Sequence, residues 1–339
     1  MLFAISAWLV VAGVALIAAF VSTTILRILL ATGWAWRLAT DIPNARSMHT
    51  RPTPRVGGWG ILPVCVLASL ILAPRLWLIA AAAAALAAIS QIDDRRGLPA
   101  RVRFLAHLAA IAALLSAYPV AGVPWWLLAA LGFAMIWLIN LYNFMDGADG
   151  LAGGMACFGF GAYSLAALYG NHPSLDLAMS GAAVAGAALG FLLLNFHPAR
   201  LFLGDAGSIP LGFLAGALGY WGWRDDVWPI WFPAMVFSPF IADATVTLLK
   251  RLSRGEKFWQ AHREHYYQRM IRAGVGHGHT AICWYLVMFV GIIVAQWAKG
   301  RPEMQQWVAL LAWYGVLAGF GLAIDMRWRR FQARTDNNS

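Results

Sequence analysis

The sequence has little charge and few cysteines. Charged residues make up 12% of the 339 positions, whereas apolar residues make up 61%. A soluble domain of this length needs more polar surface, so the composition excludes that class and indicates a protein whose solvent is the lipid bilayer. The three cysteines, Cys65, Cys157 and Cys283, all lie inside apolar runs. They give no support for a disulfide framework or a cysteine metal cluster.

Long apolar runs are abundant. A helix that crosses a bilayer needs about 20 mostly apolar residues, and eleven such runs are separated by short polar stretches. The sequence therefore predicts an all-α, polytopic membrane protein of about eleven transmembrane helices, or ten if one of the short second and third runs is re-entrant. The predicted spans are Leu2–Leu26, Trp59–Leu72, Trp77–Ile92, Phe104–Tyr118, Trp125–Ile139, Leu151–Tyr169, Leu177–Leu194, Ile209–Trp223, Trp228–Leu249, Thr280–Ala298 and Gln306–Ile324.

The positions of Lys and Arg predict the orientation. With eleven spans, all but four of the 25 Lys and Arg residues fall on one side, and the positive-inside rule makes that side cytoplasmic. The N-terminus is then outside and the C-terminus cytoplasmic, with one transmembrane catalytic domain over residues 1–325 and a basic tail over 326–339. The net charge of +10 fits anionic headgroups and an anionic substrate, and we expect no nucleic acid partner, because that would need a continuous basic face.

Two adjacent aspartates, Asp93 and Asp94, end the third predicted span. Their mutual repulsion must be relieved by a metal ion, by the neighbouring arginines or by a raised pKa. A solvated loop in which Arg95 and Arg96 pair with them explains the motif as well as a catalytic site does. Both interpretations are open at this point.

A second polar cluster follows the fifth span, where Asn140, Asn143, Asp146 and Asp149 recur every three residues. Asn140 and Asn143 can share one face of a helix, but the helix must break before Asp149, and two glycines in this stretch allow the break. Asp149 is then placed to cap the next helix. Polar groups at membrane depth are costly unless they are paired, which favours a polar pocket over a decorated helix end.

A third cluster contains Asp205, which stands between two glycines just before an apolar run. Ser208 is placed to cap that helix. A carboxylate beside a helix N-terminus can hold a cation while free N–H groups receive phosphate oxygens. The alternative, a tight turn with a capping aspartate, is weakened because the turn shares a membrane face with the other two clusters.

Basic residues in two cytoplasmic loops can hold phosphates or a sugar, although positive-inside charge and lipid contact explain any single arginine equally simply. Asp243, near the end of the ninth span, either serves the site or pairs with the nearby Lys250 and Arg251. The loop residues are Arg51 and Arg55 in the first loop, and His262, Arg263 and His265 in the largest.

Taken together and in this order, the clusters resemble those of the polyprenyl-phosphate N-acetylhexosamine-1-phosphate transferases, the glycosyltransferase 4 family. The match runs from about Arg46 to Arg272. The closest branch resembles the WecA-like and WbpL-like initiating enzymes, and the cell-wall MurNAc-pentapeptide translocases are more distant. The Asp-Asp pair, the Asn-x-x-Asn-x-x-Asp-Gly-x-Asp-Gly-Leu motif and the Asn-x-x-Pro-Ala-x-x-Phe-x-Gly-Asp motif of the family are present at 93–94, 140–151 and 195–205.

The resemblance implies transfer of an N-acetylhexosamine 1-phosphate from a UDP-sugar to undecaprenyl phosphate, with UMP released and an O-antigen type of lipid-linked glycan started. It implies Mg²⁺, with Mn²⁺ as the alternative cofactor, and a bacterial inner membrane protein with a cytoplasmic active site. Membrane lipids are further partners, and a homodimer is left open. The implied residues are Asp93, Asp94, Asp146 and Asp149 for catalysis, Asp205 and Asp94 for the metal, and Arg51, Arg55, Asn140, Asn143, Asn195, His262, Arg263 and His265 for substrates.

Two departures from the family leave the sugar open. Arg51 stands where the cell-wall branch often has Lys, and the late loop retains two histidines of a denser motif. An intramembrane prenyltransferase, the nearest competing enzyme, would need Asp-Asp-x-x-Asp, but Gly97 occupies the fifth position. A CDP-alcohol phosphotransferase would place Ala-Arg after its Asp-Gly. A transporter would hold its polar residues near the midplane between repeats, whereas these clusters lie at one face.

Overall fold

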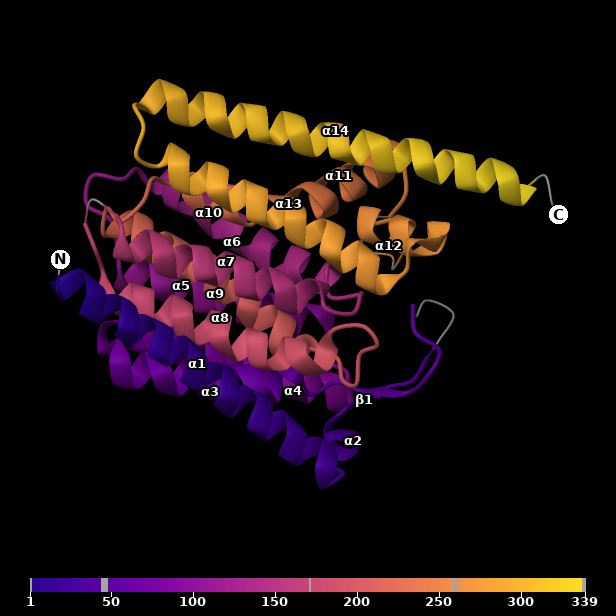
Figure 1. The fold of residues 1–339 in the computed structure, drawn as a ribbon, viewed down its shortest axis with the longest axis horizontal. Helices are drawn as coiled ribbons and strands as arrows, with labels where there is room; N and C mark the ends of the chain where they lie inside the picture. The colour runs from indigo at the N-terminus through magenta and orange to yellow at the C-terminus, as the bar shows by residue number, and fades with distance from the viewer. Residues whose placement is uncertain (1, 44–47, 171, 258–259, 261, 337–339) are drawn as a thin grey trace.

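The computed structural model describes residues 2–43, 48–170, 172–257, 260 and 262–336, and shows a bundle of helices with their long axes roughly aligned (Figure 1). The start of the family resemblance, at Arg46, lies outside the described residues. The helices are α1 Leu2–Ala31, α2 Trp34–Leu38, α3 Gly57–Leu72, α4 Trp77–Arg96, α5 Ala100–Ala117, α6 Trp125–Phe144, α7 Leu151–Leu168, α8 Leu175–Asn195, α9 Asp205–Arg224, α10 Phe232–Val236, α11 Ser238–Ser253, α12 Tyr266–Met270, α13 His277–Ala298 and α14 Glu303–Asp336, with short 3₁₀ and π turns at Pro74–Leu76 and Ile271–Val275.

The chain is an all-helical, multi-pass membrane protein. In the described ranges, eight helices are long and apolar enough to cross a membrane, namely α1, α4 to α8, α13 and α14. The expected count of eleven is met only in part. The helix α3 has 16 residues, α9 carries charged residues at both ends, and the expected span Trp228–Leu249 is broken between α10 and α11. Prolines in the first turns of α10 and α11 account for that break.

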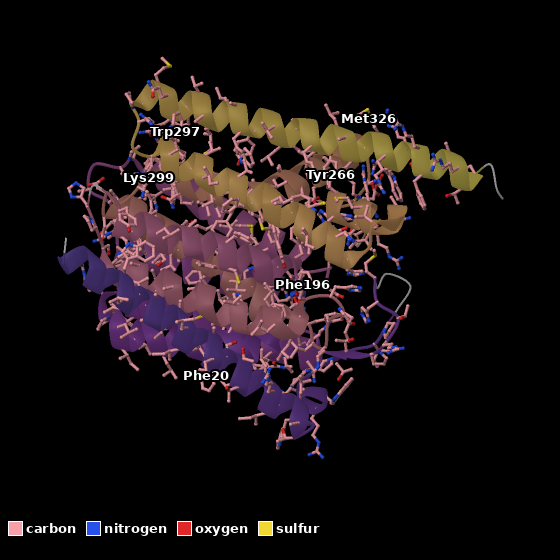
Figure 2. All side chains as sticks on the ribbon, viewed as in Figure 1. Phe20, Phe196, Tyr266, Trp297, Lys299 and Met326 are labelled. Atoms are coloured by element: carbon pink, nitrogen blue, oxygen red, sulfur yellow. The ribbon has the colours of Figure 1, made fainter. Side chains whose placement is uncertain are left out.

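Small residues allow the central helices to pack closely. Most of α7 and α8 is buried, and a Cβ atom added at Gly186 of α8 would lie 2.1 Å from the Ala15 carbonyl oxygen of α1. Only glycine permits this approach, which is the usual device for packing helices in a bilayer. The outer face of α1 is apolar and exposed, and Figure 2 shows Phe20 pointing away from the bundle.

The polar loops gather at one end of the bundle, which we call the polar end. A two-residue antiparallel ladder, β1 Thr40–Asp41 with β2 Thr53–Pro54, lies there, as does α12 (Figure 1). The C-terminus lies toward this end and the N-terminus toward the other. The number of crossings and the side of the membrane stay predictions.

Candidate active site

A cavity of about 330 Å³ opens at the polar end, between the first loop, the α6–α7 loop and the α8–α9 loop. The loops are joined by backbone hydrogen bonds, because the Val56 N–H donates to the Phe202 carbonyl at 3.1 Å and the Phe202 N–H donates to the Pro54 carbonyl at 2.8 Å. Six of the predicted site residues line the cavity: Arg55, Asn143, Asp146, Asp149, Asn195 and Asp205.

Three carboxylates from three elements converge beside this cavity. Asp205 is the first residue of α9, Asp146 follows α6, and Asp94 lies near the end of α4. The backbone N–H groups of Gly204 and Ala206 favour the charged carboxylates of Asp146 and of Asp94, respectively. Burial, followed by the charge of Asp205, raises the pKa of Asp146 well above its usual value. We refer to Asp94, Asp146 and Asp205 as the acidic trio.

The acidic trio fits a divalent cation that keeps other ligands. Among the described residues, Oδ2 of Asp94 is buried without a hydrogen-bond partner, so a donor from outside the chain is needed. In the described ranges, no group of three or more His, Cys, Asp or Glu side chains is arranged so that it could hold a metal ion by itself. Magnesium commonly keeps several waters and binds through one or two carboxylates plus substrate phosphates, so an open set of oxygen ligands is what it requires.

Arg55 is the cation that faces the acidic trio. Its Nη2 lies 2.9 Å from Oδ2 of Asp41, and its Nη1 lies 3.9 Å from Oδ1 of Asp94. The His49 ring lies 3.2 Å from the same Asp41 oxygen. Asp41 therefore holds Arg55 and His49 at the cavity, where a guanidinium can bind a phosphate.

Asp149 does not cap α7, contrary to the expectation from its spacing. Its Oδ2 accepts a hydrogen bond from Nδ1 of His197 at 2.7 Å and from the Ala199 N–H at 3.2 Å. The Asp149 N–H donates to Nδ1 of His277 at 3.3 Å, while Nε2 of His277 donates to the Met48 carbonyl at 3.2 Å. Asp149 and His277 thereby fasten three loops to one another.

The two asparagines that line the cavity are bound within the protein. Oδ1 of Asn143 accepts from the Ser208 hydroxyl at 2.6 Å. Ser208 is therefore a link between α9 and α6, and its predicted capping role is wrong because α9 begins three residues earlier. Oδ1 of Asn195 accepts from the Gly150 N–H at 2.9 Å, and its Nδ2 donates to the Leu201 carbonyl at 2.9 Å.

Asp93 does not line the cavity. It accepts hydrogen bonds from the Leu98 N–H at 2.6 Å and from Arg103 at 2.9 Å. The expected pairing with the adjacent arginines is wrong, since Arg95 donates to the Leu38 carbonyl instead. The lining of the cavity, over the described residues, also omits Arg51, Asp94, Asn140, His262, Arg263 and His265.

The late histidine loop is tied to Asp243. The His265 ring lies 3.2 Å from Oδ1 of Asp243, which also accepts from the backbone N–H of Tyr266 at 2.9 Å. Burial, followed by the charges of His265 and Arg251, lowers the pKa of His262 to about 4. His262 is therefore neutral at neutral pH.

Of the two interpretations left open for Asp243, the ion pair with Lys250 or Arg251 is not formed. Lys250 pairs with Asp325, and Arg251 pairs with Glu256 at 2.7 Å. The backbone amides of α12 satisfy Asp243 instead.

Several cavity residues were missed by the sequence reasoning. The neighbouring Gly276 and the start of an apolar run mark His277 as a helix-end polar group, and this signal was available. Nothing in the sequence marks Gln268. The missed residues in the lining are Asp41, His49, Gln268 and His277.

Comparison with known proteins shows which family and which enzymes the sequence resembles. A protein-family model, described as glycosyl transferase family 4, matches residues 76–223. This segment contains the acidic trio. Over 277 residues and 76% of each chain, the protein is 28% identical to the probable undecaprenyl-phosphate N-acetylglucosaminyl 1-phosphate transferase of Bacillus subtilis. It is 27% identical over 319 residues and 85% of each chain to the undecaprenyl-phosphate alpha-N-acetylglucosaminyl 1-phosphate transferase of Yersinia pestis.

The cell-wall branch is also related. The phospho-N-acetylmuramoyl-pentapeptide-transferase of a Synechococcus strain is 36% identical over 206 residues, which are 52% of this chain and 56% of the relative. The predicted resemblance and the predicted enzyme class are both confirmed. Residues 76–223 match glycosyl transferase family 4, and the chain is a phosphoglycosyltransferase.

Proposed function

We propose that the protein transfers N-acetylglucosamine 1-phosphate, or that of a related N-acetylhexosamine, from a UDP-sugar to undecaprenyl phosphate. UMP is released, and the product starts a lipid-linked glycan of the O-antigen type on the cytoplasmic face of a bacterial inner membrane. The observation that carries the proposal is the acidic trio beside Arg55 at the polar end of a membrane bundle. The activities for which the relatives from Bacillus subtilis and Yersinia pestis are named support the choice of sugar.

The chemistry brings two anions together. An oxygen of the lipid phosphate attacks the β-phosphorus of the donor, the bond from that phosphorus to the UMP oxygen breaks, and its electron pair leaves with UMP. Asp205, with Asp94 and Asp146 beside it, would hold magnesium, and the bound ion would supply Lewis-acid charge neutralisation and alignment of the phosphates. Arg55 donates to phosphate oxygens at the mouth of the cavity, where charge-assisted hydrogen bonds are strong.

A general base contributes little to this reaction. A phosphate monoester has a second pKa near 6, so the acceptor is largely dianionic at neutral pH. Asp93, proposed from the sequence as a catalytic group, is held by Arg103 and the Leu98 amide, which suits it to shaping the α4–α5 turn. Asp149 and Asn195, bound to the loops around them, suit the positioning of Asp146.

A covalent aspartyl phosphate is the alternative path. Asp94 is the candidate, because its Oδ2 accepts no hydrogen bond from the described residues. Enzyme mixed with the donor alone would then release UMP in a burst equal to the enzyme concentration. Direct attack by the lipid phosphate predicts no UMP until the acceptor is added.

A panel of UDP-sugars tests the proposal. The purified protein is assayed with undecaprenyl phosphate and magnesium, and UMP release is measured for each donor. We expect UMP release with an N-acetylhexosamine donor that requires both the lipid and the metal. A prenyltransferase would release diphosphate from a prenyl diphosphate and a transporter would release no nucleotide, so the absence of UMP with every donor would reject the proposal.

A further inference from the structure

The C-terminal helix α14 carries a buried carboxylate that the transfer chemistry does not use. Asp325 is 9% exposed, and its Oδ1 accepts from Nη1 of Arg269 at 2.7 Å. Its Oδ2 accepts from the Lys250 ammonium and from the Tyr266 hydroxyl. One side chain therefore ties α14 to α11 and α12, and Figure 2 shows Tyr266 on the side of α14 that faces the bundle.

A second carboxylate holds the same short helix, α12, at its N-terminal start. Asp243 of α11 accepts from the backbone N–H groups of Tyr266 at 2.9 Å and Tyr267 at 3.1 Å. The helix α12 has five residues, which is too short to persist without outside contacts. Its position is thus set by Asp243 at its start and by Asp325 along its side. We call these two aspartates the α12 clamp.

The clamped helix contacts the loop that carries part of the acidic trio. The Tyr267 hydroxyl donates to the Phe144 carbonyl at 3.0 Å, and Phe144 stands two residues before Asp146. A Cβ atom added at Gly147 would lie 2.2 Å from the same hydroxyl oxygen. The phenol is therefore packed directly on the loop backbone, and Gln268, next along α12, lines the cavity.

We infer that Asp325 is a positioning residue for the transfer reaction, acting through Arg269 and Tyr266 on α12, and through Tyr267 on the loop that carries Asp146. The inference rests on the proposed function. Loss of the Asp325 charge leaves Lys250 without its carboxylate and Arg269 with only Glu264, 3.6 Å away. Breaking a buried charge network in this way displaces the groups it held. The alternative is that Asp325 only anchors α14 to the bundle.

A double-mutant cycle separates these two roles. Asp325→Asn keeps the shape of the side chain, and Tyr267→Phe removes only the hydroxyl that contacts the loop. We expect Asp325→Asn to lower kcat for UMP release about tenfold in the wild-type background. In the Tyr267→Phe background it lowers kcat by less than about twofold, because the link to the loop is already cut. An equal loss in both backgrounds, or no loss in either, would overturn the positioning role.

Two controls keep the outcome interpretable. Glu303→Gln removes a carboxylate from the exposed, opposite end of the same helix, and should leave kcat unchanged. If Asp325→Asn does not purify as a folded protein, Tyr266→Phe takes its place in the cycle with the same expectation. A wild-type protein that releases no UMP rejects the proposed function, whereas an active wild-type protein with equal losses rejects the clamp alone.

Discussion

The buried aspartates at the polar end are of two kinds. Asp149, Asp243 and Asp325 each accept hydrogen bonds from several protein donors, whereas the acidic trio contains carboxylates that face one another. Within the described ranges, Oδ2 of Asp94 has no donor at all. A buried carboxylate is costly unless donors or cations satisfy it. The fold itself satisfies Asp149, Asp243 and Asp325. On the proposed function, a cation that comes with the substrates satisfies the acidic trio.

The two kinds should respond in opposite ways to the change from Asp to Asn. In the satisfied group, the change leaves donors or cations without their carboxylate and lowers stability. In the acidic trio, it relieves repulsion between like charges and removes a metal ligand. The change from Asp to Asn should therefore lower mainly stability in the satisfied group and mainly turnover in the acidic trio.

The largest effect is expected for Asp205→Asn. A neutral amide cannot offset the charge of two approaching phosphates, so magnesium-dependent UMP release should fall by about 10³-fold or more. The melting temperature should stay constant or rise. Asp176→Asn, in the first turn of α8, is the control with the same chemical change. Near-normal turnover in a well-folded Asp205→Asn protein would remove Asp205 from the proposed metal site.

Magnesium itself should stabilise the wild-type fold. A ligand that binds only the folded state stabilises it by about 2.7 kcal/mol at one hundred times its dissociation constant, and chelation should reverse this. In Asp146→Asn the rise in melting temperature with magnesium should shrink or vanish. Thermal unfolding over a magnesium titration measures it, and an identical rise in both proteins would argue against the acidic trio as the metal site.

Asp243→Asn should act mainly on stability. The asparagine side chain has one acceptor oxygen where aspartate has two, so one backbone N–H of α12 loses its acceptor. The loss should lower the free energy of unfolding by about 1–3 kcal/mol. Turnover should fall as a consequence of a displaced α12. If turnover is lost while the thermal unfolding curve is unchanged, Asp243 serves the reaction directly.

The smallest effect concerns His262. Its pKa falls to about 4 in the folded protein, so the folded state favours the neutral ring. The resulting stability is fully present above about pH 6.5, the pKa of an unfolded His, and declines as the pH drops toward 4. His262→Gln should flatten this decline slightly, because the ring is half-buried and solvent screens its charge. Thermal unfolding at pH 5 and pH 7 measures it, and an unchanged difference between the two pH values would contradict the assignment.

The sequence predicts the polar end well because apolar spans of fixed length bring alternate loops to the same side. It cannot tell which aspartate of the 93–94 pair approaches Arg55 and which one pairs with Arg103. Consecutive side chains point about 100° apart around a helix, and the rotation of α4 depends on tertiary packing. The roles assigned to the individual site residues stay predictions.

Partners that are distant along the chain could not be predicted from the sequence either, because they also depend on tertiary packing. Asp243 has Lys250 and Arg251 on its own helix, but its ring partner His265 is 22 residues away along the chain. The break in the ninth predicted span could have been anticipated, since Pro233 and Pro239 are both in it. The position of Gln268 at the cavity could not be anticipated, because only the placement of α12 brings this residue there.

The most direct test of the account follows an oxygen-18 label placed in the bridge between the anomeric carbon and the β-phosphorus of the donor. Attack at phosphorus leaves the carbon–oxygen bond intact, so the label should appear in the lipid product while unlabelled UMP is released. Attack at the anomeric carbon would instead release UDP carrying the label and would require carboxylates arranged as in a glycosidase. Mass spectrometry of the lipid product and of the nucleotide decides between them. A label-free lipid product formed together with labelled UDP would contradict the phosphotransfer mechanism.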